Sequence, residues 1–223
     1  MTNELLFIAQ SIILSLFALL ALRLGKAALV AFISVLCLLS NLFILKQITL
    51  FGFAATCCDA YTIGVVLGLN LLQEYYGKST AQKTIVISFV LLICYTIMSL
   101  MQLAYIPNVH DLAQPHFAYI LSSMPRITAA SLMVYLFVQY VDSLLYAWLR
   151  TLLQGNYLVA RVWFSLSITQ LLDTILFSFF GLYGLVDNLF ELICISYGIK
   201  LIAIALTTPF IALSRRFRQA EDV

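Results

Sequence analysis

The stretch "LFVQYVDSLLYAW", residues 136–148, places an aspartate, Asp142, in the middle of an apolar run. The run belongs to a longer apolar segment, 127–149, which has the roughly 20 residues that a helix needs to cross a bilayer. A second stretch, "SITQLLDTILFSFF" at 167–180, repeats the arrangement with Asp173. An ionised side chain at the centre of a span costs about 2.5–3.5 kcal/mol on insertion scales. We therefore expect both aspartates to face the interior of a helical bundle and not the lipid.

The composition of the whole chain agrees with a membrane protein. Of the 223 residues, 63% are hydrophobic and 10% are charged, whereas a soluble domain has about 25% charged residues. Because so few charges cannot cover a water-facing surface, the sequence predicts an all-α, polytopic transmembrane helical bundle that forms a single integral membrane domain over residues 1–223. Seven apolar stretches are long enough to span a bilayer: 5–22, 27–45, 48–72, 84–106, 127–149, 162–184 and 190–213.

The distribution of basic residues predicts the orientation of these spans. With seven spans, nine Lys and Arg residues fall on one side of the membrane, and two, Lys46 and Arg126, fall on the other. Cytoplasmic connections carry the excess of Lys and Arg in membrane proteins. We therefore expect the N-terminus outside and the C-terminus in the cytoplasm.

Several polar groups inside the spans are candidates for one shared site. Two glutamines precede the aspartates by three residues, so Gln139 with Asp142 and Gln170 with Asp173 each share a helix face. The side chains of both pairs should lie at a similar depth in the membrane, near the centres of their spans. This shared depth favours a substrate site over a hydrogen-bond cluster that only holds helices together. The polar residues inside the expected spans are Asn41, Asp59, Asn70, Gln139, Asp142, Gln170, Asp173 and Lys200.

The chemistry of these groups suggests a flat, polar small molecule. A carboxylate accepts two parallel N–H bonds, and a carboxamide both donates and accepts, which suits the edge of a guanine-like ring. Nearby aromatic side chains can stack on a flat heterocycle. Because two aspartates carry one more negative charge than Lys200 balances, the site would also accept a cationic amine on the ligand. The two histidines lack the ligand number and spacing of a metal site, so we expect no metal and no cofactor.

Five segments follow one another in an order and spacing typical of one family: "SNLFILKQI" (40–48), "NLLQEYYGKSTAQK" (70–83), "RITAASLMVYLFVQYVD" (126–142), "SLSITQLLDTILF" (165–177) and "KLIAIALTTP" (200–209). In these segments the chain resembles the queuosine-precursor transporter family, also called VUT. The resemblance covers roughly residues 27–213. It implies six family helices, with residues 5–22 as one extra N-terminal helix.

The resemblance also implies a function. Members of the family take up deazaguanine bases across the bacterial inner membrane, and these bases become the nucleoside queuosine in tRNA. Queuine, 7-aminomethyl-7-deazaguanine and 7-cyano-7-deazaguanine are such bases. The implied partners are this small molecule and the lipid bilayer, with no nucleic acid and no enzymatic activity. The resemblance does not determine the energy source of transport, whether the chain forms a homodimer, or whether it needs an energising partner subunit.

The resemblance assigns site residues by position. Asp142 or Asp173 would accept the ring N–H and the exocyclic amine, Gln139 or Gln170 would pair with the ring carbonyl, and Lys200 would balance the buried negative charge. Many members carry Asp where this chain has Asn70, which leaves the exact substrate open. The candidate substrate-binding residues are Asn41, Asp59, Asn70, Arg126, Gln139, Asp142, Gln170, Asp173 and Lys200. Asp59 is a candidate because it lies inside an apolar run and not because it matches the family's pattern. Positions outside this candidate set that do match the pattern are Glu74, Gly77, Ser131, Ser165, Thr174 and Pro209.

Two other readings compete with this one. The chain could be the substrate-binding subunit of an energising-factor vitamin transporter, which needs an ATPase partner because this sequence has no P-loop. It could also be an intramembrane enzyme in which Asp142 and Asp173 share a proton. The enzyme reading is disfavoured because "TQLLDT" (169–174) lacks the Gly-x-Gly that precedes the second aspartate of such proteases.

Overall fold

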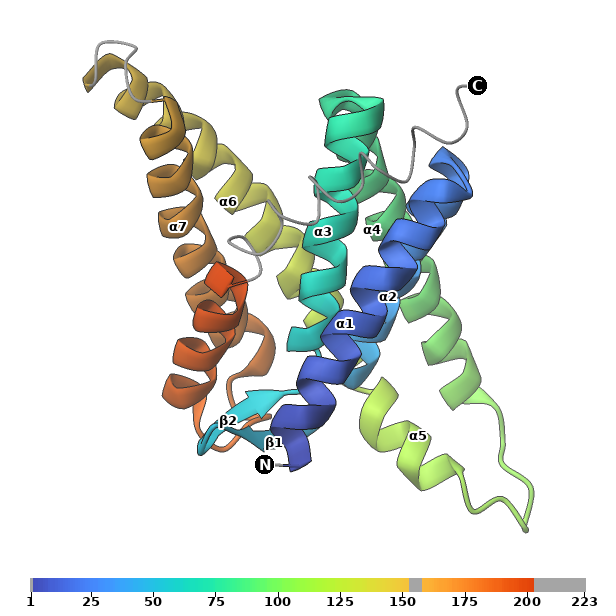
Figure 1. Cartoon of the computed structure of the whole chain (residues 1–223). Helices are drawn as coiled ribbons and strands as arrows, with labels where there is room; N and C mark the ends of the chain where they lie inside the picture. Colours follow the sequence, from blue (N-terminus) through green and yellow to red (C-terminus); the bar gives the residue numbers. More distant parts are fainter. Residues whose placement is uncertain (1, 153–157, 203–223) are drawn as a thin grey trace.

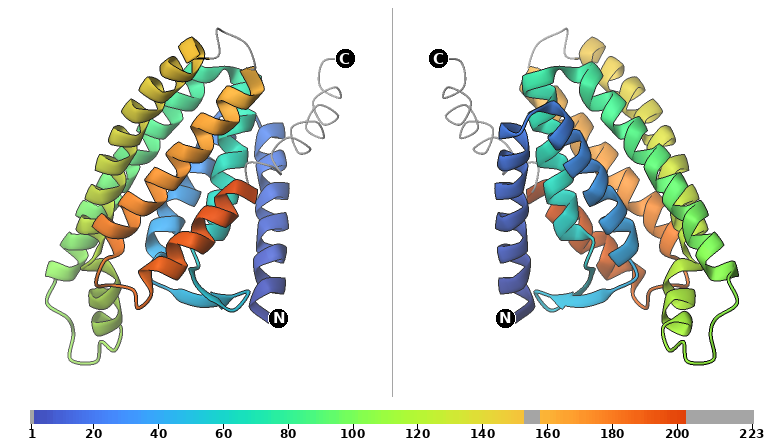
Figure 2. Two further views of the ribbon diagram at one scale, coloured as in Figure 1. Left: turned by 90° about the vertical axis from the view of Figure 1, so that its left-hand side faces the viewer. Right: turned by 90° about the vertical axis from the view of Figure 1, so that its right-hand side faces the viewer.

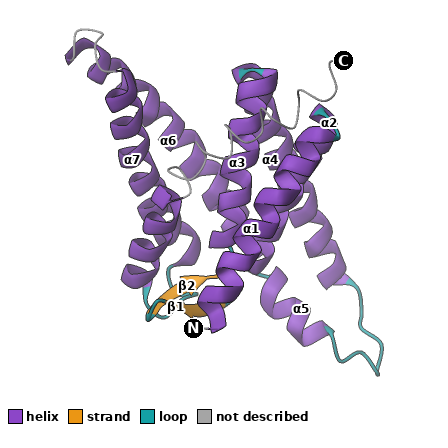
Figure 3. Cartoon of the chain, viewed as in Figure 1, coloured by secondary structure: helices purple, strands orange, loops and turns teal. Residues whose placement is uncertain are grey.

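The computed structural model describes residues 2–152 and 158–202, and most of them are helical (Figure 3). A π-helical turn, Ser178–Leu182, ends the last labelled helix, and residues 189–202 are again helical. The labelled elements are α1 (Thr2–Arg23), α2 (Lys26–Phe43), β1 (Gln47–Leu50), β2 (Phe53–Thr56), α3 (Asp59–Tyr76), α4 (Lys78–Ala104), α5 (Gln114–Leu121), α6 (Met124–Leu152) and α7 (Leu158–Phe177).

The fold class expected from the sequence is confirmed. Within the described residues, four segments are long and apolar enough to cross a membrane: Thr2–Arg23, Lys26–Phe43, Lys78–Ala104 and Gln114–Asp142. The segment Ser167–Leu182 is apolar but shorter. The last expected span, 190–213, is helical as far as residue 202, and its remainder, with Pro209, lies outside the described residues.

The long helices form two groups. Helices α1 to α4 pack together, and α6, α7 and residues 189–202 lie on the other side of α3 (Figures 1 and 2). Successive long helices alternate in direction, so the α1–α2 and α3–α4 connections lie at one end of the bundle. The N-terminus and the two short strands lie at the opposite end.

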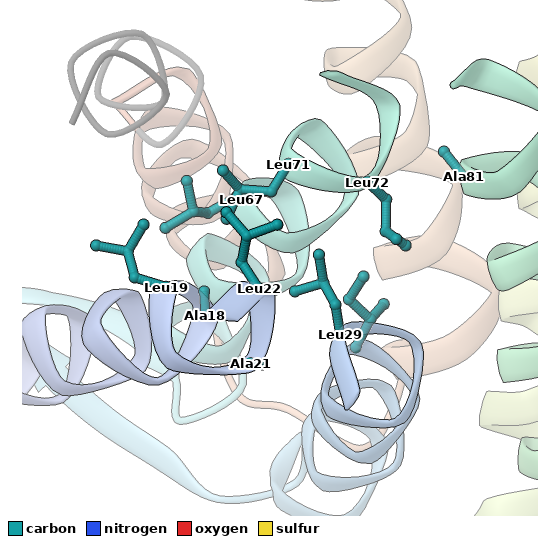
Figure 4. Packing of buried hydrophobic residues seen from close by; sticks show 10 residues of the cluster. Ala18, Leu19, Ala21, Leu22, Leu29, Leu67, Leu71, Leu72 and Ala81 are labelled. Atoms are coloured by element: carbon teal, nitrogen blue, oxygen red, sulfur yellow. The ribbon is translucent and has the colours of Figure 1, made fainter. Parts of the chain in front are cut away.

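Close packing of α3 against α1 and α2 makes the first group compact. Leu67 and Leu71 of α3 pack against Leu19 and Leu22 of α1 in a buried cluster (Figure 4). Gly68 lets α2 approach closely, because a Cβ atom there would come within 2.7 Å of Cγ1 of Ile33. A Gly-x-x-x-Gly pattern, Gly64 to Gly68, thus serves here as a helix-packing face.

The expected span 48–72 is wrong at its start, because residues 47–56 form an antiparallel hairpin and α3 begins only at Asp59. The residues between Gln47 and Thr56 are rich in β-branched and aromatic types around a glycine, a composition that favours strands. Phe51 and Gly52 form the two-residue turn, with φ of 53° and 85°. Positive φ at both turn residues matches the right-handed twist of the two strands.

Hydrogen bonds from two helices hold the hairpin at its end of the bundle. At the start of α1, the side-chain amide of Asn3 donates to the carbonyl of Thr49 in β1 (3.0 Å). The Phe51 N–H donates to the carboxylate of Glu4 (3.2 Å). From the other helix group, Glu191 accepts the N–H of Ala54 (3.0 Å). The hairpin therefore joins the two groups, and its last residues are fixed close to the start of α3.

Candidate functional site

A cavity of about 190 Å³ lies between the two helix groups. It is somewhat larger than the roughly 150 Å³ cavity that takes one benzene molecule, so it suits a small ring compound. Most of its lining side chains are polar, although the chain as a whole is mostly apolar. The lining residues are Ser40, Asn41, Ile44, Thr56, Cys58, Asp59, Thr62, Ser131, Asp173, Thr174, Phe177, Ser178, Leu182, Leu192, Ser196 and Lys200.

An ion pair forms one wall of the cavity. Nζ of Lys200 lies 2.6 Å from Oδ2 of Asp173, and the two side chains are only 15% and 30% exposed. The same ammonium group also donates to the hydroxyl of Thr174 (3.0 Å). That hydroxyl in turn donates to the Gln170 carbonyl one turn earlier in α7 (2.7 Å). Lys200 is thus fixed by a carboxylate and a hydroxyl, and Asp173 keeps lone pairs that can accept further N–H groups.

Asp59 supplies a second carboxylate on the opposite helix group. It is 3% exposed, and its Oδ2 accepts hydrogen bonds from the hydroxyls of Ser196 (3.1 Å) and Thr56 (3.4 Å). Thr56 is the last residue of the hairpin and Asp59 the first of α3. A carboxylate in the first turn of a helix is stabilised by the helix dipole. The first residue of α3, hydrogen-bonded to the last residue of the hairpin, thereby presents an acidic group to the cavity.

Asn41 offers the cavity an acceptor without a partner. Its Nδ2 donates to the Cys37 carbonyl in the preceding turn of α2 (2.9 Å). Its Oδ1 is buried and has no hydrogen-bond partner among the described residues. Leaving a buried acceptor unsatisfied costs about 1–3 kcal/mol. A bound molecule with an N–H group at this position would remove that cost.

A second cavity of about 250 Å³ adjoins the first. The two share the side chains of Ser40, Asn41, Thr62 and Ser131. The remainder of the second cavity is mostly apolar and includes an aromatic pair from α4 and α6, Phe89 and Tyr135, whose ring centroids are 5.0 Å apart. Asn41 therefore lies at the boundary between a charged compartment and an apolar one.

Four of the nine residues predicted from the sequence line the charged cavity: Asn41, Asp59, Asp173 and Lys200. The cavity lies in the half of the bundle near the hairpin, because it is lined by the last turns of α2 and α7 and the first turn of α3. Neither of the two adjoining cavities is lined by the other five: Asn70, Arg126, Gln139, Asp142 and Gln170.

Distance along α6 explains why Asp142 lies away from the cavity. Ser131 is the residue through which α6 lines it, and Asp142 follows 11 residues later. At 1.5 Å per residue this separation is about 16 Å. Asp142 and Gln139 both make interactions of their own in the bundle. The shared depth expected for both Gln–Asp pairs is therefore not observed, since α7 reaches the cavity near its C-terminal end and α6 near its N-terminal end.

Arg126 contacts backbone and not the cavity. Its guanidinium donates to the carbonyls of Phe180 (2.9 Å) and Tyr183 (2.7 Å) at the end of the π-helical turn. The last carbonyls of a helix lack partners within the helix. Arg126 satisfies two of them and holds in place the turn that contributes Ser178 to the cavity.

Sequence reasoning did not find the hydroxyl groups of Thr56 and Ser196, although the family resemblance included Thr174. Thr56 and Ser196 both donate to Asp59, and the Lys200 ammonium donates to Thr174. Serine and threonine are common at helix contacts in membranes, so their presence carries no specific signal. The spacing of Ser196 and Lys200 is a usable clue, because residues four apart lie on one helix face.

Comparison with known proteins places the chain in a family. Residues 60–214 match the family described as "Putative vitamin uptake transporter". The chain belongs to this family. Asp173 and Lys200 lie within the matched region, whereas Asn41 and Asp59 precede it. Family membership and the apolar helices together make the chain a multi-pass membrane protein of a transporter family.

A curated relative is similar over most of its length. It is the "Probable queuosine precursor transporter" of Bacillus subtilis (strain 168), 27% identical over 190 residues, which cover 83% of this chain and 82% of the relative. No solved structure matches the chain. The resemblance seen in the sequence motifs is therefore confirmed by both the vitamin uptake transporter family and this relative.

Proposed function

We propose that the chain imports a queuosine precursor, a deazaguanine base, and binds it in the charged cavity. The observation that carries the proposal is the ion pair of Lys200 and Asp173 in a polar cavity within an otherwise apolar bundle. The volume of about 190 Å³ suits a fused-ring base. The name of the Bacillus subtilis relative supports the same class of substrate.

The cavity offers partners for the polar edge of such a base. The free lone pairs of the Asp173 carboxylate accept a ring N–H and an exocyclic amine, while Lys200 balances its charge. The buried Oδ1 of Asn41 accepts a further N–H from the base. Phe177 lines the same cavity and provides an aromatic surface for the ring. In this assignment Asp173 takes the role for which the sequence offered both Asp142 and Asp173.

The distribution of basic residues supports an orientation for the proposed import. Arg23 and Lys26 flank the α1–α2 connection and Lys78 begins α4, all at the end opposite the hairpin (Figure 1). Lys46, next to the hairpin, lies at the other end. The excess of basic residues marks the cytoplasmic side. The N-terminus and the hairpin then face outward, and the base enters from the hairpin end of the bacterial inner membrane.

A bacterial uptake assay tests the proposal. The chain is expressed in cells that neither make queuosine nor import its precursors, one base is supplied at a time, and queuosine in tRNA is measured. Wild-type protein should restore queuosine. Asp173→Asn should abolish it at equal membrane expression, because the neutral amide no longer balances Lys200. Asp187→Asn, which removes an exposed carboxylate outside the cavity, serves as the matched control and should retain uptake.

Absence of queuosine with every base, despite good expression, would contradict the proposal. Uptake by the purified protein in vesicles without ATP would further show that it needs no ATPase partner. Uptake only after addition of such a partner would favour the energising-factor arrangement instead.

A further inference from the structure

The charges lining the cavity do not balance. Among the lining residues there are two carboxylates, Asp59 and Asp173, and one basic side chain, Lys200. Lys200 lies against Asp173 at 2.6 Å. The side chains that donate to Asp59 are the hydroxyls of Thr56 and Ser196, which carry no charge. The single positive charge among the described lining residues, that of Lys200, is therefore shared: it pairs with Asp173 and also acts on Asp59, so the two carboxylates exceed it by one negative charge.

The helical segment 189–202 hydrogen-bonds to both carboxylates. Ser196 and Lys200 lie four residues apart and so on one face of this segment. Ser196 bonds to Asp59 of α3 and Lys200 bonds to Asp173 of α7. A ligand in the cavity thus meets an ion pair at one wall and a carboxylate with neutral donors at another.

A buried carboxylate of this kind favours a cation as its partner. Removing a charge from water is expensive unless an opposite charge and hydrogen bonds replace the lost hydration. Two hydroxyl donors return only part of that cost, because they hydrogen-bond to the carboxylate without supplying an opposite charge. An ammonium group on the transported molecule would supply the missing charge.

We propose that Asp59 is the counter-ion of an ammonium group on the transported base, so that the cavity selects an amine-bearing base over a neutral one. This inference rests on the proposed function. Among deazaguanine precursors it favours 7-aminomethyl-7-deazaguanine, which carries a primary amine, over 7-cyano-7-deazaguanine, whose nitrile is neutral. The polar edge of the ring faces Asp173 and Asn41, and the aminomethyl group faces Asp59.

Binding to the purified full-length chain in detergent tests the inference. Each of the two bases is titrated separately into wild-type protein and into Asp59→Asn, which keeps the size of the side chain and removes its charge. Wild-type protein should bind the aminomethyl base more tightly. In Asp59→Asn its affinity should fall by roughly 30-fold or more, the lower end of the effect of removing one partner of a buried charged pair. The affinity for the cyano base should stay within a few-fold.

Two further variants keep the test interpretable. Asp187→Asn alters an exposed carboxylate and should leave both affinities unchanged. Ser196→Ala removes a neutral donor and keeps the Asp59 charge, so the preference for the aminomethyl base should persist even if this variant is less stable. Thermal unfolding of every variant shows whether it is folded.

The outcomes separate the inference from the function on which it rests. Equal wild-type affinity for the two bases, or an unchanged preference in folded Asp59→Asn, would overturn the counter-ion role and leave deazaguanine transport intact. Equal affinity accompanied by uptake of one proton with the cyano base would overturn it in favour of a protonated Asp59. Failure of the folded wild-type protein to bind either base would instead remove the proposed function.

Discussion

At the scale of single residues, Lys200 and Asp173 stabilise each other in a mostly buried position. Removing one partner of a buried ion pair costs about 3–5 kcal/mol, because the remaining charge loses its compensation, whereas replacing both partners is often neutral. We therefore expect Lys200→Met to lower the thermal unfolding temperature strongly. Adding Asp173→Asn should recover much of the loss in unfolding temperature but no transport, as measured by melting in detergent and by queuosine in tRNA. A double variant no more stable than Lys200→Met would contradict this account.

Gly68 allows a second residue-scale prediction. A Cβ atom at this position would come within 2.7 Å of Ile33, and overpacking of this kind costs about 1–3 kcal/mol. Gly68→Ala should therefore destabilise the contact between α2 and α3 and lower the unfolding temperature. The matched control is Gly198→Ala, because a Cβ atom at Gly198 would meet nothing within 4 Å. If the two variants melted alike, close approach would not be the reason for glycine at position 68.

At this scale the sequence placed Asp173 and Lys200 in the bundle interior, where the structure pairs them. Their role in substrate binding stays a prediction. A charged residue within a span must face the protein interior, and the opposite charges of Asp173 and Lys200 favour a contact there. The rule does not say which interior contact the residue makes. Asp142 obeys it equally well, yet it lies too far along α6 to reach the charged cavity.

At the scale of elements, the hairpin shows where hydropathy alone fails. The residues from Gln47 to Thr56 are as apolar as a helical span, and only the turn at Phe51–Gly52 separates two strands. A four-residue strand is too short for periodicity to distinguish it from a helical turn. The start of the expected span 48–72 therefore could not be placed from composition, although the helix that follows the hairpin, α3, could.

Glu191 provides a test of the hairpin as a connection between the two helix groups. Its carboxylate accepts the N–H of Ala54, so Glu191→Ala should leave this N–H without its partner and increase hydrogen exchange at Ala54. Base affinity should fall as well, because the hairpin positions Thr56 at the cavity. Glu191→Gln keeps an accepting oxygen and should preserve most of the protection. Unchanged exchange at Ala54 in the alanine variant would show that other contacts fix the hairpin.

At the scale of the whole molecule, the cavity is formed where the two helix groups meet. Its residues come from α2, α3 and the hairpin on one side and from α6, α7 and residues 189–202 on the other. The number and order of apolar segments predicted a bundle, because each long apolar helix must cross the bilayer. They could not predict which helix ends would converge, since that depends on packing between groups distant in sequence.

The π-helical turn at Ser178–Leu182 has a consequence for comparing this chain with its relatives. A π turn arises when one extra residue is accommodated within an α-helix, and here both Ser178 and Leu182 line the cavity. A homologue without the extra residue should align with a one-residue gap between the positions of Phe177 and Tyr183. Because the π turn accommodates the extra residue locally, the difference would be confined to the side chains that this turn presents to the cavity. An insertion of one amino acid would thus be enough to change which side chains of this turn face the transported molecule.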